Sequence, residues 1–251
     1  MVALLFEKPS TRTRVSFEAG IVELGGHPMV LRAGELQLSR GESPGDTARV
    51  LSRHVQALGV RTHEDALLDE LAAAATIPVF NMLSAGHHPC QALADLMTLR
   101  EAFGSLEGLR VAYVGDGNNV ARSLALLGAA AGVEVVVASP DGFALDGHAP
   151  VTDPAAAVAG ANAVYTDVWV SMGDEATASE RRTALAPFRV DDALLDRAAA
   201  GAVALHCLPA HPGEEITSEV LYGPRQRIWE QAENRRHAQK ALLEWLLTTT
   251  P

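Results

Sequence analysis

Residues 2–14 read VALLFEKPSTRTR, a short apolar run that leads through a proline into a cluster of hydroxyl and arginine side chains. The apolar run predicts a buried strand, and the residues after it predict the start of a helix. Ser10 or Thr11 can cap that helix, whose first backbone N–H groups point outward and attract anions. With Arg12 and Arg14 alongside, the stretch predicts a strand-to-helix turn that binds a phosphate-like group.

Short apolar runs and longer alanine- and leucine-rich stretches alternate along the rest of the chain. This alternation predicts an α/β fold with two doubly wound parallel-sheet domains and helices on both faces. We expect strands at 2–6, 28–31, 57–61, 78–82, 110–115, 133–138, 162–166 and 202–206. We expect helices at 14–24, 46–56, 64–74, 91–103, 120–131 and 191–199.

A glycine-flanked stretch at 104–108 follows one of the expected helices and is the best candidate for a domain junction. We therefore expect a first domain over residues 1–103 and a second over 104–230. The tail at 231–251 is amphipathic over most of its length, so we expect a last helix that packs back on the first domain.

Composition excludes several classes of protein. The 251 residues are 48% hydrophobic and 20% charged, which is enough for two domains with cores of their own. A formal net charge of -11 argues against a general nucleic-acid binder, because such binding needs positive surfaces. Against this acidic background, the local arginine cluster indicates a small anionic ligand.

The chain has two cysteines, Cys90 and Cys207, and so few are typical of a reduced cytoplasmic protein. Neither a CxxC nor an HExxH motif occurs, so we expect no metal. No apolar run approaches the roughly 20 residues that cross a bilayer, and no signal-peptide pattern is present. We expect a cytoplasmic protein that contacts neither membrane nor nucleic acid.

Polar residues follow the expected strands where those strands end. In open α/β sheets, ligands collect at the carboxyl ends of strands. The residues after the earlier strands suit a phosphate and a carbonyl, and those after the later strands suit an amino acid. They are 10–14, Arg61, 87–91, 115–119, 167–173 and 206–209.

Each of these signals also has an ordinary structural explanation. The hydroxyl and arginine cluster could be a plain helix cap with solvated arginines. His88 could be a hydrogen-bonded buried histidine, Cys207 a small core residue, and Asp167 and Ser171 the caps of a following helix. It is the order of the whole set along one α/β chain that favours a functional site.

Residues 115–117 read GDG and suggest a dinucleotide-binding loop. The GxGxxG pattern is incomplete, because Val120 stands where its third glycine belongs. We therefore expect no nucleotide cofactor.

The motifs together resemble the ornithine branch of the aspartate/ornithine carbamoyltransferase family. Residues 6–14, FEKPSTRTR, are similar to the carbamoyl-phosphate signature of the family, and HPCQ at 88–91 resembles its HPTQ element. Asp167 with SMG at 171–173, and HCLP at 206–209, resemble the elements that mark the ornithine branch. Gln37 and Arg235 also match family positions.

This resemblance implies carbamoyl transfer from carbamoyl phosphate to the δ-amine of L-ornithine, giving citrulline and phosphate in arginine metabolism. It implies a homotrimer, or a multiple of trimers, without a cofactor. Carbamoyl phosphate would be bound by Ser10, Thr11, Arg12, Thr13, Gln37, Arg61, His88, Gln91, Cys207, Leu208 and Arg235. Ornithine would be bound by Asn119, Asp167, Ser171 and Met172. The catalytic residues would be Arg61, His88, Asp167 and Cys207.

The chain departs from the family pattern in two places. The family begins with a further helix before the first strand, and we expect this chain to lack it. Cys90 stands where threonine is common, which matters only if that side chain touches carbamoyl phosphate. Two alternatives stay open: a transferase for another acceptor, such as putrescine, an acylated ornithine or aspartate, or a noncatalytic binding subunit with the same fold.

Overall fold

The structure, a computed structural model, describes residues 1–171, 173 and 175–249. The chain divides into two compact units, one formed by Met1–Cys90 with Arg235–Pro251 and the other by Gln91–Asn234. Each unit holds one four-stranded parallel sheet with helices on both faces, so the predicted fold class is confirmed. The division between the units falls within the helix that ends at Phe103.

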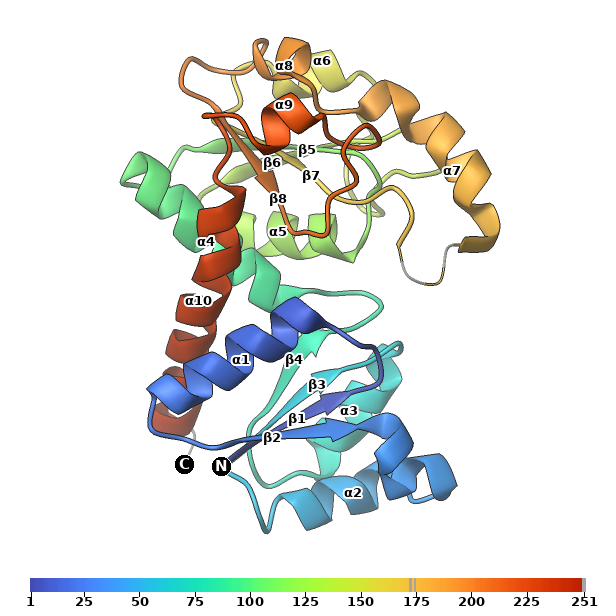
Figure 1. The fold of residues 1–251 in the computed structure, drawn as a ribbon, viewed down its shortest axis with the longest axis vertical. Coiled ribbons are helices and arrows are strands. Elements are labelled where there is room, and N and C mark those ends of the chain that lie inside the picture. Colours follow the sequence, from blue (N-terminus) through green and yellow to red (C-terminus); the bar gives the residue numbers. More distant parts are fainter. Residues whose placement is uncertain (172, 174, 250–251) are drawn as a thin grey trace. The chain divides into compact units, whose positions relative to one another are not determined.

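The sheet of the first unit has the order β2-β1-β3-β4, with all neighbours parallel (Figure 1). The central strand β1 is buried along its whole length, because helices cover both of its faces. The strands of this sheet are β1 (Val2–Phe6), β2 (Pro28–Arg32), β3 (Ala57–Arg61) and β4 (Val79–Leu83).

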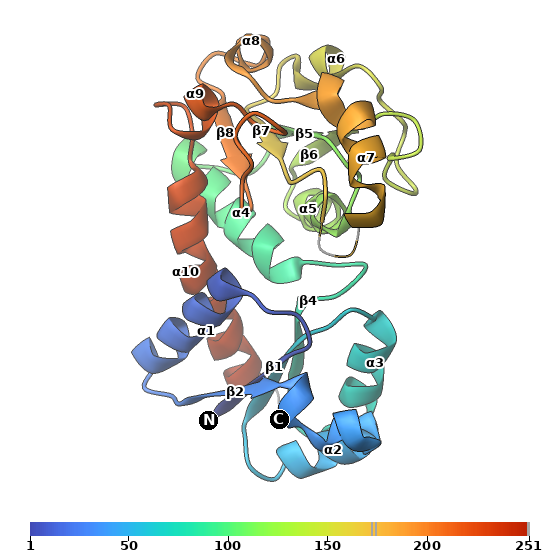
Figure 2. The ribbon, with the colours of Figure 1, turned by 45° about the vertical axis from the view of Figure 1, so that its right-hand side comes forward.

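Alternate residues of β1 face two different sets of helices. Val2 and Leu4 pack with Phe17 of α1 and Leu243 of α10, whereas Ala3 and Leu5 pack against α2 and α3. Figure 2 shows α1 beside α10, and Gly20 of α1 allows a close approach to Arg236 and Lys240 in the middle of that helix. The helices are α1 (Thr11–Glu23), α2 (Pro44–Leu51), α3 (Asp65–Ala74) and α10 (Ile228–Thr249), with 3-10 turns η1 (Ala33–Glu35) and η2 (Gln37–Arg40).

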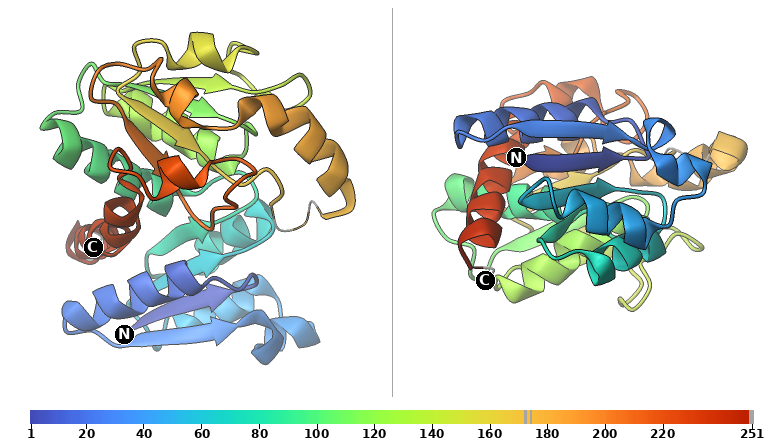
Figure 3. Two further views of the ribbon diagram at one scale, coloured as in Figure 1. Left: turned by 45° about the horizontal axis from the view of Figure 1, so that its top comes forward. Right: turned by 90° about the horizontal axis from the view of Figure 1, so that it is seen from below.

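The sheet of the second unit has the order β6-β5-β7-β8 and is also parallel throughout (Figure 3). Helices α4 and α5 pack on one face, and α6, α8 and α9 on the other. The strands are β5 (Arg110–Val114), β6 (Glu134–Ala138), β7 (Ala163–Thr166) and β8 (Val203–His206). The helices are α4 (Pro89–Phe103), α5 (Asn119–Ala130), α6 (Pro154–Val158), α7 (Ala178–Leu185), α8 (Asp192–Leu195) and α9 (Ser218–Leu221), with 3-10 turns η3 (Glu175–Thr177) and η4 (Ala186–Phe188).

Every strand expected from the sequence is present, with ends that differ by one or two residues at most. The helix expected at 191–199 is wrong in extent, since α8 ends at Leu195. The chain leaves the helix there because the Ala199 N–H bonds to the Ala161 carbonyl instead of to its own turn. The short helices α6, α7 and α9 were not predicted. Within the described residues, no helix has the length and apolar character needed to cross a membrane.

Candidate active site

The turn after β1 begins a helix as the sequence predicts. Ser10 is the N-cap of α1: its Oγ accepts a hydrogen bond from the Thr13 N–H at 3.3 Å, and its carbonyl accepts one from the Arg14 N–H at 3.1 Å. Thr11 and Arg12 lie exposed in the first turn. The turn therefore presents hydroxyl groups, an exposed guanidinium and a helix N-terminus together, as an anion site requires.

Thr13 joins two arginines from distant parts of the first unit. Its Oγ1 lies 3.4 Å from Nη1 of Arg61, at the end of β3, and 3.2 Å from Nη2 of Arg235, on α10. All three residues are buried, with exposed fractions of 1%, 6% and 4% in that order. Two buried cations that converge on one hydroxyl create a strongly positive point, which favours a bound anion.

His88 belongs to the same positive region. The pKa of its imidazole lies well below the usual 6.5, first because the ring is buried and then because Arg235 and Arg61 repel a further positive charge. The ring is therefore neutral at physiological pH. A neutral imidazole can still donate one N–H bond to a carbonyl oxygen without adding charge to the site.

Cys90 is buried, and its thiol faces protein backbone: Sγ donates to the Asn81 carbonyl at 3.3 Å. Burial raises the pKa of this thiol to about 11, so it remains protonated. The side chain that replaces the family's threonine is thus engaged with β4.

Two other residues that were predicted to bind carbamoyl phosphate differ in burial. Gln37 is exposed on the 3-10 turn η2 of the first unit. Gln91 is buried in the second unit, where its amide nitrogen donates to Oδ1 of Asp95 at 2.7 Å. The same Asp95 oxygen accepts from Nε2 of Gln231 at 2.6 Å, and Oε1 of Gln231 accepts from the His206 N–H at 2.9 Å. This chain of hydrogen bonds ties α4 and the first turn of α10 to the end of β8.

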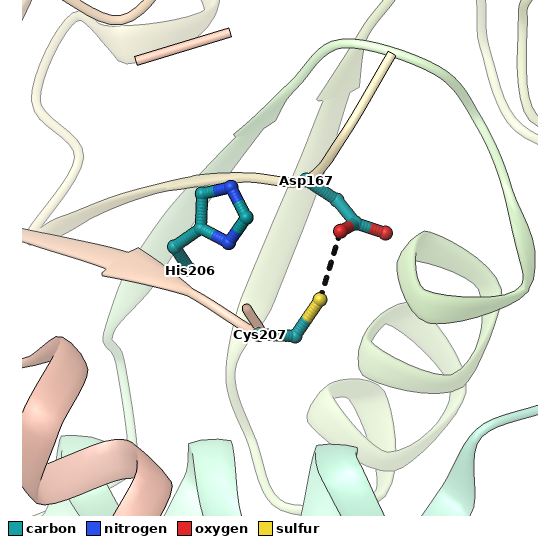
Figure 4. A group of neighbouring side chains, drawn as sticks. All are labelled: Asp167, His206 and Cys207. Atoms are coloured by element: carbon teal, nitrogen blue, oxygen red, sulfur yellow. Dashed lines mark hydrogen bonds between the residues drawn. The ribbon is translucent and has the colours of Figure 1, made fainter. Parts of the chain in front are cut away.

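Asp167 and Cys207 follow neighbouring strands β7 and β8 of the second unit, and their side chains meet (Figure 4). The thiol of Cys207 donates to Oδ1 of Asp167 at 2.9 Å. Asp167 is only 7% exposed, so its carboxylate lies at the bottom of the site with the sulfur beside it. An anionic oxygen and a thiol so placed can bind or orient an amine.

His206 supports the backbone of this site. Its Nδ1 accepts the Leu208 N–H at 2.8 Å, while Nε2 lies 3.0 Å from Oε1 of the buried Glu215. Leu208 has a φ of 60°, a conformation that side chains disfavour and that therefore needs such support.

Asp167, His206 and Cys207 each offer one ligand atom within 4.8 Å of the others, which is a spacing that could suit a metal. Both nitrogens of His206 are already engaged, by Leu208 and by Glu215, and the thiol is bonded to Asp167. A metal at this position would have to break these bonds.

The residues expected around ornithine lie close by in the second unit. Asn119 is the first residue of α5, and Ser171 follows β7 in a partly buried position. Met172 lies outside the described residues. Tyr113, Asn118 and the Asp95 network were not predicted as part of the site. The polar run at 115–119 did predict a role for this loop, but through Asn119 and not through Asn118.

Comparison with known proteins agrees with this arrangement. The carbamoyl-P binding domain of the aspartate/ornithine carbamoyltransferases matches residues 1–101, and their Asp/Orn binding domain matches residues 107–246. The chain belongs to this family. Two curated family members are similar over nearly its whole length. Ornithine carbamoyltransferase of Acidothermus cellulolyticus is 56% identical over 262 residues, covering 98% of this chain and 84% of the relative. The same enzyme of Parafrankia sp. is 52% identical, with 99% and 84% covered.

Solved structures of family members have the same fold. Ornithine carbamoyltransferase from Pyrococcus furiosus superposes with a TM-score of 0.94 at 49% identity, covering 98% of this chain and 84% of that one. The protein from Thermus thermophilus gives a TM-score of 0.91 at 44% identity, with 100% and 86% covered. The family resemblance noted from the motifs is thus confirmed along the whole chain.

Proposed function

We propose that this protein transfers the carbamoyl group of carbamoyl phosphate to the δ-amine of L-ornithine, forming L-citrulline and phosphate. The observation that carries the proposal is the identity of 56% and 52% to two ornithine carbamoyltransferases across nearly the full chain. The reaction needs a held phosphate, a polarised carbonyl and a neutral amine.

The turn after β1 binds the phosphate group. Ser10, Thr11, Arg12 and Thr13 bind it through hydroxyl groups, backbone N–H groups and one guanidinium. Arg61 and Arg235 support this assignment, because both converge on Thr13 within 3.4 Å. As the C–O bond to phosphate breaks, their positive charge stabilises the leaving group. Gln37 contributes at the edge of this ligand.

His88, Arg61 and Thr13 contact the carbonyl oxygen of carbamoyl phosphate and polarise it. The lowered pKa of His88 keeps its ring neutral, so it acts as a hydrogen-bond donor to the oxyanion that forms on attack. Gln91, Cys207 and the Leu208 carbonyl orient the carbamoyl amide. Catalysis then rests on orientation and preorganised charge, which together can lower a barrier by several kcal/mol.

Ornithine is bound by Asn119, Asp167, Ser171 and Met172. Asp167 supplies a counter-charge for the α-ammonium group. The δ-amine has a pKa of about 10 in solution, so it must lose a proton before it attacks. Cys207, held by Asp167 at 2.9 Å, steers this amine.

The family membership also supports further proposals. A carbamoyl-phosphate-binding domain spans 1–103 together with the helix at 231–251, and an ornithine-binding domain spans 104–230. The protein works as a homotrimer. It acts in the cytoplasm, as a chain with only two cysteines suggests, and it serves arginine biosynthesis without a cofactor.

The decisive experiment offers the purified protein carbamoyl phosphate with ornithine, putrescine, N-acetylornithine or aspartate in parallel. We expect citrulline from ornithine and no comparable product from the others. Arg12→Ala should lower kcat/KM for carbamoyl phosphate by about 10- to 100-fold, the value of one charged hydrogen bond.

Arg14→Ala is the matched control, because Arg14 lies on the same helix, exposed, and pairs with Glu18 at 3.2 Å. It should retain kcat/KM within about threefold, since exposed ion pairs contribute little. Folded protein that carbamoylates none of these acceptors would contradict the proposal, and product from another acceptor alone would reassign the substrate.

A further inference from the structure

Asn118 stands between the cap of α5 and the carboxylate of Asp167, and its amide is held in one orientation. Its Oδ1 accepts hydrogen bonds from the Val120 N–H at 2.9 Å and the Ala121 N–H at 3.1 Å. A third donor, the Tyr113 hydroxyl, lies 3.1 Å from the same oxygen. Three donors at one atom identify that atom as the oxygen, because an amide nitrogen could accept none of them.

Tyr113 is a reliable donor in this arrangement. Its ring is fully buried on β5 and stacks on Tyr165 with centroids 5.4 Å apart. Burial, followed by the nearby charges of Asp167, Cys207 and Asp116, raises the pKa of Tyr113 well above 10. The hydroxyl therefore keeps its proton and donates it to Asn118.

With the oxygen side fixed, the amide nitrogen of Asn118 can only face Asp167. Nδ2 donates to Oδ2 of Asp167 at 2.9 Å. The other carboxylate oxygen, Oδ1, accepts from the Val168 N–H at 2.8 Å and from the Cys207 thiol at 2.9 Å. Both carboxylate oxygens of Asp167 thus have hydrogen-bond partners. Because Asn118 holds Oδ2, it also determines where Oδ1, the oxygen bonded to the Cys207 sulfur, lies.

We infer that Asn118 is a positioning residue for the transfer reaction: its amide orients Asp167, and through Asp167 it orients the Cys207 thiol. The inference rests on the proposed function, since it concerns the residues assigned there to ornithine. Capping alone does not explain the asparagine, because serine and aspartate cap helices about as well. Of these residues, only asparagine has a second polar atom, Nδ2, that donates while its oxygen accepts the capping bonds; serine has one oxygen on a shorter side chain.

The test compares Asn118→Ser, which keeps a cap but loses the donor, with Asp153→Ser. Asp153 caps the exposed start of α6 by accepting from the Ala155 N–H at 2.9 Å, and α6 packs on the face of the sheet opposite to α5. We expect Asn118→Ser to lower kcat/KM for ornithine about 10-fold or more, while KM for carbamoyl phosphate changes less than about twofold. Asn118→Asp keeps the acceptor but sets a second carboxylate against Asp167, so its loss should be larger.

A second readout does not depend on turnover. The Cys207 thiol is engaged by Asp167, which Asn118 holds in place, so loss of that hold should free the sulfur and speed alkylation of Cys207 by iodoacetamide several-fold in Asn118→Ser. Buried Cys90 serves as an internal control for unfolding and should stay unmodified by mass spectrometry. Asp153→Ser should match the wild type in both readouts.

The inference is overturned if Asn118→Ser keeps wild-type kcat/KM for ornithine, or if Cys207 is alkylated at the wild-type rate. It is also overturned if Cys90 becomes modified at the same rate as Cys207, since the effect is then general unfolding. Failure of the proposed function is a different result, because wild-type protein would then form no citrulline while the alkylation rates still report on Asn118.

Discussion

Thr13 is a small residue with a large electrostatic consequence. Its hydroxyl brings Arg61 and Arg235 to within 3.4 Å of one atom, and both guanidinium groups are more than nine-tenths buried. Buried like charges are costly unless an anion or a hydrogen-bond network compensates them. A dianionic phosphate offsets much of that cost on binding, so part of the ligand's affinity comes from relief of repulsion in the free protein.

The same charges act on His88. Burial and then these charges lower its pKa in the folded state, so the free energy of unfolding depends on pH through this residue. The folded pKa lies well below the ordinary 6.5, so the unfolded chain takes up a proton near pH 6 that the folded chain refuses. Stability therefore falls as the pH drops through 6.5, by at most about 1.4 kcal/mol per pH unit for this one group. We expect wild type to lose more unfolding free energy between pH 7 and pH 5.5 than His88→Gln, as measured by urea denaturation.

The difference between the two proteins isolates His88 from the other histidines, which are present in both. A wild-type curve parallel to that of His88→Gln over this pH range would contradict the prediction. Loss of citrulline formation in the same variant is expected but does not bear on this point, because His88 is also assigned to the carbonyl oxygen.

At the scale of the elements, the sequence specifies the strands better than the helices. The strands of both sheets are short apolar runs because helices cover both faces, and such runs stand out from alanine-rich stretches. Helices α6, α8 and α9 span only four or five residues. A helix of one turn leaves no repeat for a periodicity to detect, so its existence depends on packing that only the folded unit supplies.

Site residues divide in the same way. Thr13, Asp167 and Cys207 lie within motifs at strand ends and could be predicted. Asn118 could not be separated from Asn119 by sequence, since what distinguishes it is a contact with Asp167, 49 residues away. The bond from Gln231 to Asp95 spans 136 residues and has no local signal at all. Sequence reasoning thus finds the groups that we propose to touch substrate more readily than the groups that hold them.

The loop before α5 packs tightly against the backbone of residues 144–145, and Gly117 allows this packing to be tested. A Cβ on Gly117 would lie 2.4 Å from the Leu145 backbone nitrogen and 2.8 Å from the Ala144 carbonyl carbon. Backbone atoms cannot turn aside as a flexible side chain can, so Gly117→Ala must shift the loop that carries Asn118. We expect a loss of about 2 kcal/mol or more in unfolding free energy, together with lower kcat/KM for ornithine.

Gly34→Ala is the matched control, because a Cβ there meets nothing within 4 Å. Its unfolding free energy should stay within about 0.5 kcal/mol of wild type, as for most surface changes. Equal stability of the two variants in urea denaturation would show that the contact at Gly117 is looser than its distances imply.

At the scale of the whole molecule, net charge and substrate charge have the same sign. The chain carries a formal charge of -11, yet one of the two proposed substrates, carbamoyl phosphate, is itself an anion. Long-range attraction therefore cannot supply the affinity, and the buried arginine pair must do so at short range, where salt screens it weakly.

The same charge bears on the proposed homotrimer, the last prediction. Three chains of charge -11 repel one another, so association must come from short-range contacts and should strengthen when salt screens the repulsion. We expect light scattering at physiological ionic strength to give three times the chain mass of 26.5 kDa. Because assembly stabilises the folded state by mass action, Tm should also rise with protein concentration. A mass of one chain, with full activity and a Tm independent of concentration, would contradict the trimer and place every residue that the reaction needs within a single chain.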